Sequence, residues 1–278
     1  MSVRRAAVAL ASALIVATPA LAARADTRTE TARLRAWTVT LTYRVEGAPD
    51  FQRLRELRMR ADVHGRTAFD RRVPLPPACR DAQCVVLGRD VRLLELKDLG
   101  GNAPSALVSL WTGGAHCCSI VEVVPLDGAR ITWRNFGNPG ASVVRYRDVP
   151  LFVSEDDRFS YLYTSYAASV RPLQLWLLKP GRFVDVTASY RGLIARDAKS
   201  LWGSVQQLAR GGEEIRGAFA AWAADACRLS GRSRVEAAAA PLLAAGAFSP
   251  PHTDPLGPTG ARYARVLLRD LARFGYCR

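Results

Sequence analysis

Lysine and histidine are scarce in this chain, and the common catalytic motifs are missing. Only three of the 39 basic residues are lysine, and there are three histidines in 278 residues. The sequence holds no Gly-x-Ser-x-Gly elbow, no His-Glu-x-x-His pair and no phosphate-binding loop. No enzyme class is indicated. Whether the protein catalyses a reaction stays open, and the balance favours a protein that is not an enzyme and uses no cofactor.

Long hydrophobic runs are missing too. Residues 6–17 carry no charge, but a spanning helix needs about 20 apolar residues. Arg4 and Arg5 precede this run, and small-x-small triplets follow it at residues 20–22 and 23–25. These are the three parts of a secretory signal peptide. Residues 1–25 therefore predict a secreted or periplasmic (exported) protein with no transmembrane segment after signal cleavage; a short uncleaved membrane anchor is the alternative.

Most of the positive charge comes from scattered arginines. The net charge is +14 at pH 7, and the densest arginine run, Arg53 to Arg60, alternates with Leu54, Leu57 and Met59. Such alternation is typical of the solvated face of a strand or helix. A basic surface that binds an anionic polymer is one possible function, whereas the scatter does not favour nucleic acid as a partner.

Six cysteines in an exported chain indicate disulfide bonds. The disulfide candidates are Cys79, Cys84, Cys227, Cys277, Cys117 and Cys118. The first two flank four residues after a proline-rich turn, which favours a small local loop. A bridge between Cys227 and Cys277 would close about 50 residues and add on the order of 3–4 kcal/mol of stability. The adjacent pair could form its own bridge, or one member could pair with Cys79 or Cys84.

Alternation with period 2 predicts a β-rich domain over residues 34–190. Asp127-Gly128 and Pro180-Gly181 mark turns between strands. Residues 26–33 are polar, and we predict a flexible N-terminus there. The predicted strands are 37–45, 57–63, 67–73, 91–96, 106–111, 119–125, 130–136, 159–163, 173–178 and 183–187.

Helical spacing takes over in residues 191–278. The predicted helices are 197–208, 213–229, 233–245 and 259–274. Asp197 can cap the first of them, and Gly211-Gly212 can end it. We therefore predict an α+β protein: an antiparallel β-rich domain, as a sandwich or a partial-propeller-like sheet, followed by a small C-terminal helical domain.

The sharpest feature is the run 111–118, Trp-Thr-Gly-Gly-Ala-His-Cys-Cys. Three hypotheses compete for His116, Cys117 and Cys118. The first is structural: the cysteines are bridged and the histidine is a packed side chain. The second is a metal site, because His and Cys bind zinc or copper, although adjacent strand residues point to opposite faces. The third is a reactive thiol whose pKa is lowered by the histidine.

The run 113–118, Gly-Gly-Ala-His-Cys-Cys, resembles a motif of a family of uncharacterised exported bacterial proteins. In that family the motif follows a degenerate acidic loop similar to the calcium loops of FG-GAP/VCBS propeller repeats. The resemblance covers roughly residues 90–278 and implies no established activity. The other similar stretches are residues 98–104, 146–150, 156–159, 181–187, 221–225 and 273–276.

The acidic loops implied by this resemblance depart from the calcium pattern. Calcium needs six to eight oxygen ligands, but the first loop offers only Asp98 and Asn102, and the second only Asp148. These three residues are weak candidates, and we predict no metal site. We expect the two loops to keep their turn conformation without a bound calcium ion.

Two further groups of residues could carry chemistry. The acidic run 155–157 could serve acid–base or metal chemistry, but a charged loop partly neutralised by Arg158 is preferred. An aromatic-rich stretch could be a platform for carbohydrate or peptide; its residues are Tyr161, Tyr163, Tyr166, Trp176 and Phe183. Because period 2 would place Phe159, Tyr161 and Tyr163 on one face of a strand, we predict that the stretch belongs to the core.

The leading functional hypothesis is a secreted or periplasmic, non-catalytic binding or interaction module, with the sheet as its scaffold. Its envelope or extracellular partner cannot be identified from the sequence. One alternative is a thiol- or metal-dependent activity centred on His116, Cys117 and Cys118, which free thiols would favour. The other is a basic surface that binds an anionic polymer, which salt-sensitive retention on heparin would favour.

Overall fold

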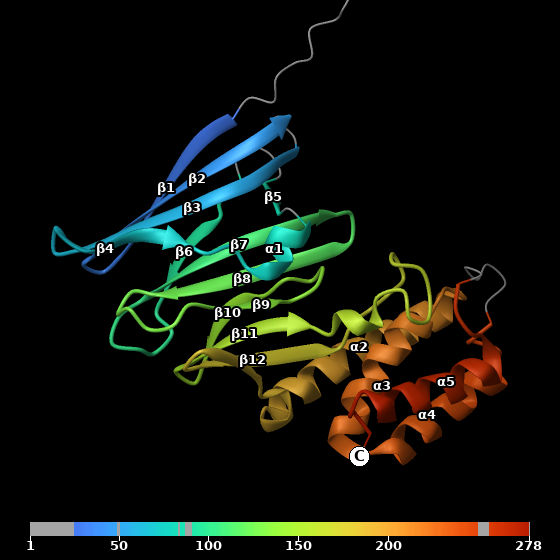
Figure 1. Ribbon diagram of the computed structural model, residues 1–278. Coiled ribbons are helices and arrows are strands. Elements are labelled where there is room, and N and C mark those ends of the chain that lie inside the picture. Colours follow the sequence, from blue (N-terminus) through green and yellow to red (C-terminus); the bar gives the residue numbers. More distant parts are fainter. Residues whose placement is uncertain (1–24, 49–50, 83, 87–90, 250–255, 278) are drawn as a thin grey trace, which may run out of the picture.

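The computed structural model describes residues 25–48, 51–82, 84–86, 91–249 and 256–277. The predicted signal peptide lies outside these residues, apart from Ala25. The described strands form two antiparallel sheets, and a group of helices follows them along the chain (Figure 1). The predicted α+β class, with a β-rich part before a helical part, is confirmed.

The larger sheet comprises β1 (Ala25–Leu34), β2 (Trp37–Ala48), β3 (Phe51–Val63), β4 (Arg66–Val73), β5 (Val85–Val86), β6 (Leu94–Lys97), β7 (Ser105–Gly114), β8 (Cys117–Pro125) and β9 (Thr132–Asn135). Their order is β1-β2-β3-β5-β7-β8-β9, with β4 paired to β3 and β6 paired to β7. The smaller sheet has the order β10-β11-β12-β13. Its strands are β10 (Ser142–Tyr146), β11 (Val149–Glu155), β12 (Leu173–Lys179) and β13 (Arg182–Asp185).

The helices lie mainly in the last third of the chain. The bounds are α1 (Pro77–Ala82), α2 (Arg191–Gly211), α3 (Arg216–Ser230), α4 (Arg232–Ala244) and α5 (Gly260–Arg273). Helix α2 begins earlier than predicted, so Asp197 lies inside the helix and does not cap it, and the left-handed backbone of Gly212 (φ +66°) makes the C-cap. Within the part of the chain that the structure describes, no helix is both long and apolar enough to cross a bilayer.

The flexible N-terminus predicted for residues 26–33 is instead part of β1. This strand pairs with β2 along its whole length, from Ala25 opposite Glu46 to Leu34 opposite Trp37. Its outward side chains, such as Thr29, are exposed, and its inward ones are only half-buried. The strand therefore lacks the apolar alternation that a sequence analysis detects, and its backbone pairing holds it in place.

The strand predicted at residues 159–163 is not formed. A 3-10 turn spans Asp157–Phe159, and bends follow it. Phe159 and Tyr163 belong to the helical core, but Tyr161 is 50% exposed, so the three rings do not share one face. Strands β10 and β11 went unpredicted because the turn between them consists of Arg147 and Asp148. Both have positive φ, which glycine or asparagine more often adopts.

The larger sheet curls around one apolar core. Strands β2, β3, β6, β7 and β8 all contribute to it, and Leu41 and Ile120 are fully buried there. The carboxylate of Glu30, on β1, accepts hydrogen bonds from the N–H groups of Leu93 and Leu94, each at 3.0 Å. These bonds hold β1 beside β6, so the sheet closes partway into a barrel around the core.

The smaller sheet packs on the outer face of β7 and β8. Leu107 and Val121 point to this face and meet Phe136, Phe152 and Trp176 in a second core. The smaller sheet thus lies between the larger sheet and the helices (Figure 1). A third core joins the helices and also takes in Phe159 and Tyr163 from the segment between β11 and β12.

One acidic side chain lies inside the barrel core. Glu122 lies between Ile120 and Val124 on the inward face of β8 and is 1% exposed. Its Oε2 atom has no hydrogen-bond partner among the described residues. Because burial disfavours the charged form, the pKa of Glu122 is raised to about 8.

Glu122 should make the protein less stable as the pH rises. The folded state holds this proton more tightly than the unfolded chain does. The contribution of Glu122 to the free energy of unfolding is therefore complete below about pH 4.5. It decreases as the pH rises toward 8, by at most about 1.4 kcal/mol per pH unit. Glu122→Gln should reduce the slope of this part of the profile, as measured by urea unfolding at a series of pH values. Glu56→Gln, at an exposed site on β3, should keep the wild-type slope; an unchanged slope in Glu122→Gln would contradict the assignment.

Candidate functional site

The His-Cys-Cys run lies at the tip of the β7–β8 hairpin. The register shifts between Trp111 and Gly114, and Gly114 pairs with Cys117. Gly113 has φ +83°, a conformation that side chains rarely adopt. A Cβ on Gly114 would lie 2.9 Å from the Cys117 carbonyl oxygen. The Gly-Gly pair therefore lets the chain turn and approach itself closely.

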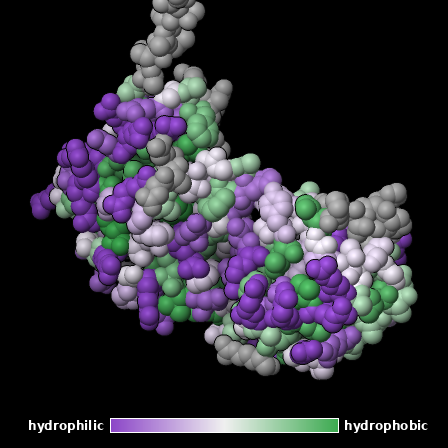
Figure 2. Space-filling model, turned by 45° about the vertical axis from the view of Figure 1, so that its right-hand side comes forward, coloured by the Kyte–Doolittle hydropathy of each residue, from purple (hydrophilic) through white to green (hydrophobic). Residues whose placement is uncertain are grey.

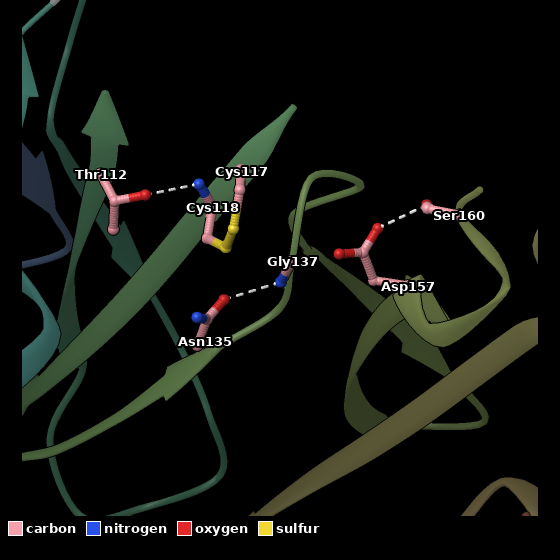
Figure 3. Close-up of a disulfide and its surroundings, with 7 residues drawn as sticks. All are labelled: Thr112, Cys117, Cys118, Asn135, Gly137, Asp157 and Ser160. Atoms are coloured by element: carbon pink, nitrogen blue, oxygen red, sulfur yellow. Dashed lines mark hydrogen bonds between the residues drawn. A yellow bond between two sulfur atoms is a disulfide. The ribbon is translucent and has the colours of Figure 1, made fainter. Parts of the chain in front are cut away.

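Cys117 and Cys118 are bridged to each other across a cis peptide bond (Figure 3). The Cys118 N–H donates a hydrogen bond to Thr112 Oγ1 at 2.7 Å, which ties the bridge to β7. The other bridges are Cys79–Cys84 and Cys227–Cys277. With all six cysteines bridged, this structure leaves no thiol to act as a nucleophile or metal ligand. The described residues also contain no group of three His, Cys, Asp or Glu side chains arranged to hold a metal ion.

His116 stacks on a tyrosine from a distant segment. Its ring lies 3.9 Å from that of Tyr166 (centroid to centroid), with an interplanar angle of 7°. Its Nδ1 atom is hydrogen-bonded to the Tyr161 hydroxyl. The Tyr161 N–H donates to Ser169 Oγ at 3.0 Å, which holds the left-handed backbone of Tyr161. We call His116, Tyr161 and Tyr166 the aromatic cluster; it joins the hairpin tip to the segment between β11 and β12.

A glycine turn fills the space between the bridge and that segment. The Gly137 carbonyl accepts from Ser119 N–H at 2.7 Å, and its own N–H donates to Asn135 Oδ1 at 2.8 Å. A Cβ on Gly137 would lie 2.4 Å from Asp157. Figure 3 shows Gly137 between the bridge and Asp157, which accepts from Ser160. Only glycine fits this position without moving one of its neighbours.

A cleft of about 780 Å³ opens beside the hairpin, between the outer face of β7–β8 and strand β11. Its floor includes Trp111 and Val121, and its far wall includes Val153 and Leu173. The lining residues are Val85, Val91, Arg92, Leu93, Ser109, Leu110, Trp111, Ser119, Ile120, Val121, Pro139, Gly140, Ala141, Ser142, Val153, Ser154, Glu155, Arg171, Leu173 and Asp197.

The charged groups of the cleft come from separate segments. Glu155 forms an ion pair with Arg171 at 2.9 Å, and the Arg171 guanidinium lies 5.6 Å from the centre of the Tyr166 ring. Arg171 thus connects the cleft to the aromatic cluster. Asp197 accepts from Leu173 N–H at 3.2 Å. Sequence analysis missed the site roles of Arg171 and Asp197, because isolated residues in distant segments leave no local pattern.

The residues of the acidic run 155–157 lie in different environments. Only Glu155 lines the cleft. Asp156 is buried, pairs with Arg158 at 2.5 Å and accepts from the Tyr276 hydroxyl at 2.7 Å. Burial acts to raise the pKa of Asp156, but the hydrogen bonds from Arg158 and Tyr276 outweigh it, and the pKa is lowered. Asp156 therefore links the smaller sheet to the C-terminal segment, a structural role.

A second titrating carboxyl lies behind the cleft. Asp225, on α3, is fully buried. Burial and a hydrogen bond with Asp197 raise its pKa to about 8, and Arg228, at 3.3 Å, opposes the rise. The raised pKa favours the protonated form of Asp225, and its interaction with Asp197 connects the cleft wall to α3.

The two acidic loops implied by the family resemblance meet at an arginine. Arg145 donates to the carbonyl oxygens of Asp98, at 3.1 Å, and Asp148, at 2.9 Å. The Asp98 carboxylate pairs with Arg35 at 2.6 Å, and Asn102 is exposed. The turns are thus held together by a guanidinium group and backbone oxygens.

Comparisons with known proteins add one relative. No family model matches the chain, and no solved structure matches it. A probable thylakoid lumen protein from Synechocystis sp. is 32% identical over 146 residues, which cover 49% of this chain and 43% of the relative. The match thus spans less than half of that protein's length.

The three bridges should differ in their response to a reductant. Cys79, Cys84 and Cys227 are at least 95% buried, whereas Cys117, Cys118 and Cys277 are only half-buried. Cys117–Cys118 is thus the bridge in which both cysteines are accessible, and low concentrations of a phosphine reductant should open it first. Alkylation of the native protein followed by peptide mass mapping checks this order. Without reductant no cysteine should be labelled, and prior labelling of either other pair would contradict the prediction.

Proposed function

We propose that the protein is a non-catalytic binding module of the secreted or periplasmic space, whose ligand occupies the cleft beside the hairpin tip. The cleft is the observation that carries this proposal. Its volume of about 780 Å³ is within the usual range for small-molecule sites, and such sites combine apolar walls with a few polar groups that fix orientation. Trp111 and Leu173 provide apolar surface here; Ser109 and Arg171 provide polar groups.

The carboxylates that line the cleft already have partners within the chain, which supports a binding function over a catalytic one. Glu155 is paired with Arg171, and Asp197 interacts with Leu173 N–H and Asp225. A general base needs access to a substrate proton within hydrogen-bond reach, and these carboxylates are already committed to partners within the chain. Such groups suit recognition of a polar ligand, whose own dipoles can complete the network.

Three observations support export. The relative from Synechocystis sp. is named as a probable thylakoid lumen protein. The three bridges suit an oxidising compartment. The N-terminal sequence has the layout of a signal peptide. The Gly-Gly-Ala-His-Cys-Cys resemblance, which we retain as a proposed family assignment, points to exported proteins as well.

Filling the cleft should abolish binding. Ser109 is exposed and lines the cleft, so Ser109→Trp should block it with little cost to folding. Ligand-observed NMR against a fixed set of monosaccharides, amino acids and dipeptides provides the measurement. We expect members that bind the wild type to lose at least about tenfold in affinity. Ser204→Trp, at an exposed site on α2, should bind like wild type. The proposal fails if no member binds, or if Ser109→Trp binds equally well.

A second candidate function uses the exposed arginines of β3 and β4. On β3 the side chains of Arg53, Arg55, Arg58 and Arg60 are all exposed, and Arg72 lies opposite Arg58 on β4. Figure 2 shows hydrophilic side chains gathered over the part of the molecule that holds β1 to β4. Such a surface suits an anionic polymer, which would bind by charge and in a salt-dependent way.

Heparin chromatography tests this second candidate. Replacing Arg53 and Arg72 with Gln should lower the salt concentration needed for elution. The slope of log affinity against log salt should fall by about one per contact removed. The matched control replaces Arg262 and Arg265, which are exposed on α5, and changes the net charge equally. Equal effects of the two double variants would show that only net charge matters.

A further inference from the structure

A second cavity lies in the helical part and shares no lining residue with the cleft. It has a volume of about 410 Å³ and is formed by α2 and α4. We call it the α2–α4 groove. Its lining residues are Trp202, Val205, Gln206, Ala209, Arg210, Arg234, Ala237, Ala238, Pro241 and Leu242.

The spacing of these residues explains why a groove forms. On each helix they recur at i, i+3, i+4, i+7 and i+8, which is one continuous helix face. On α4 that face carries the small side chains of Ala237 and Ala238, so it leaves space opposite α2. Trp202 and Leu242 remain only partly buried. An apolar surface is thus left accessible between two helices.

Each wall of the groove contributes one arginine. Neither Arg210 nor Arg234 has an ion pair or hydrogen bond with another side chain in the described residues. In contrast, Arg232 is paired with Glu236 at 2.7 Å. Arg234 also lies in the first turn of α4, which holds no acidic residue. A cation at a helix N-terminus is unfavourable, so a bound anion there would offset an existing cost.

We propose that the α2–α4 groove binds an amphiphile with an unbranched apolar chain and an acidic head group. The chain would lie along Trp202, Ala238 and Leu242, where it removes apolar surface from water. The head group would pair with a groove arginine, because an unpaired guanidinium is the natural partner of a carboxylate or phosphate. This site is separate from the cleft of the proposed function and does not depend on it.

Titration calorimetry with laurate, below its critical micelle concentration, tests the proposal. We expect one laurate per protein and at least about tenfold weaker binding when Arg210 and Arg234 are both replaced by Gln. The matched control, Arg262→Gln with Arg265→Gln on α5, should bind like wild type. Dodecyltrimethylammonium, with the same chain and the opposite charge, should bind at least about tenfold more weakly than laurate. Equal binding of the two amphiphiles, or equal loss in both arginine pairs, would overturn the proposal.

A variant that fills the groove distinguishes laurate binding in the groove from binding elsewhere on the basic surface. Ala237→Trp should fill the groove and abolish laurate binding, whereas Ala240→Trp, exposed on α4 outside the groove, should not. Both variants should keep the wild-type circular dichroism spectrum. Retained binding in folded Ala237→Trp refutes the site. Ser109→Trp, which blocks the cleft, should leave laurate binding unchanged, so the two proposals can fail independently.

Discussion

The β7–β8 hairpin contributes side chains from both of its faces to two separate cores, and the arrangement of the rest of the molecule depends on this. Its inward side chains, such as Val108 and Ile120, belong to the barrel core, and its outward ones, such as Leu107 and Val121, belong to the second core. Each fully buried aliphatic side chain contributes about 1.5–3 kcal/mol. The smaller sheet could therefore not separate from the larger one without a large loss of stability.

The tip of the same hairpin reaches the segment that enters the helical core. His116 stacks on Tyr166 and is hydrogen-bonded to Tyr161, while Phe159 and Tyr163 of this segment pack among the helices. A bridge between adjacent residues closes almost no chain, so it adds little by restricting the unfolded state. The effect of this bridge is local, because it restricts the backbone conformations of the hairpin tip that carries His116. The long Cys227–Cys277 bridge acts on the unfolded chain instead.

The sequence predicts best those helices and strands that have one solvent-exposed face and one buried face. Strand β2 alternates from Trp37 onward, and α5 carries Tyr263, Leu267 and Leu271 on one buried face, so both were predictable. Strand β1 was missed because its outward threonines and half-buried inward residues conceal the alternation. Strands β10 and β11 were missed because Arg147 and Asp148 adopt positive φ values, a conformation that no residue preference signals. The cleft could not be predicted at all, because Ser109, Glu155, Arg171 and Asp197 meet only through the packing of separate segments.

Glu30 has a consequence for association between molecules. Backbone N–H groups along an open sheet edge can recruit a strand from another chain, which is a common route to aggregation. At the seam between β1 and β6, the N–H groups of Leu93 and Leu94 are already occupied by the Glu30 carboxylate. An incoming strand would have to displace a charged acceptor before it could add to the sheet.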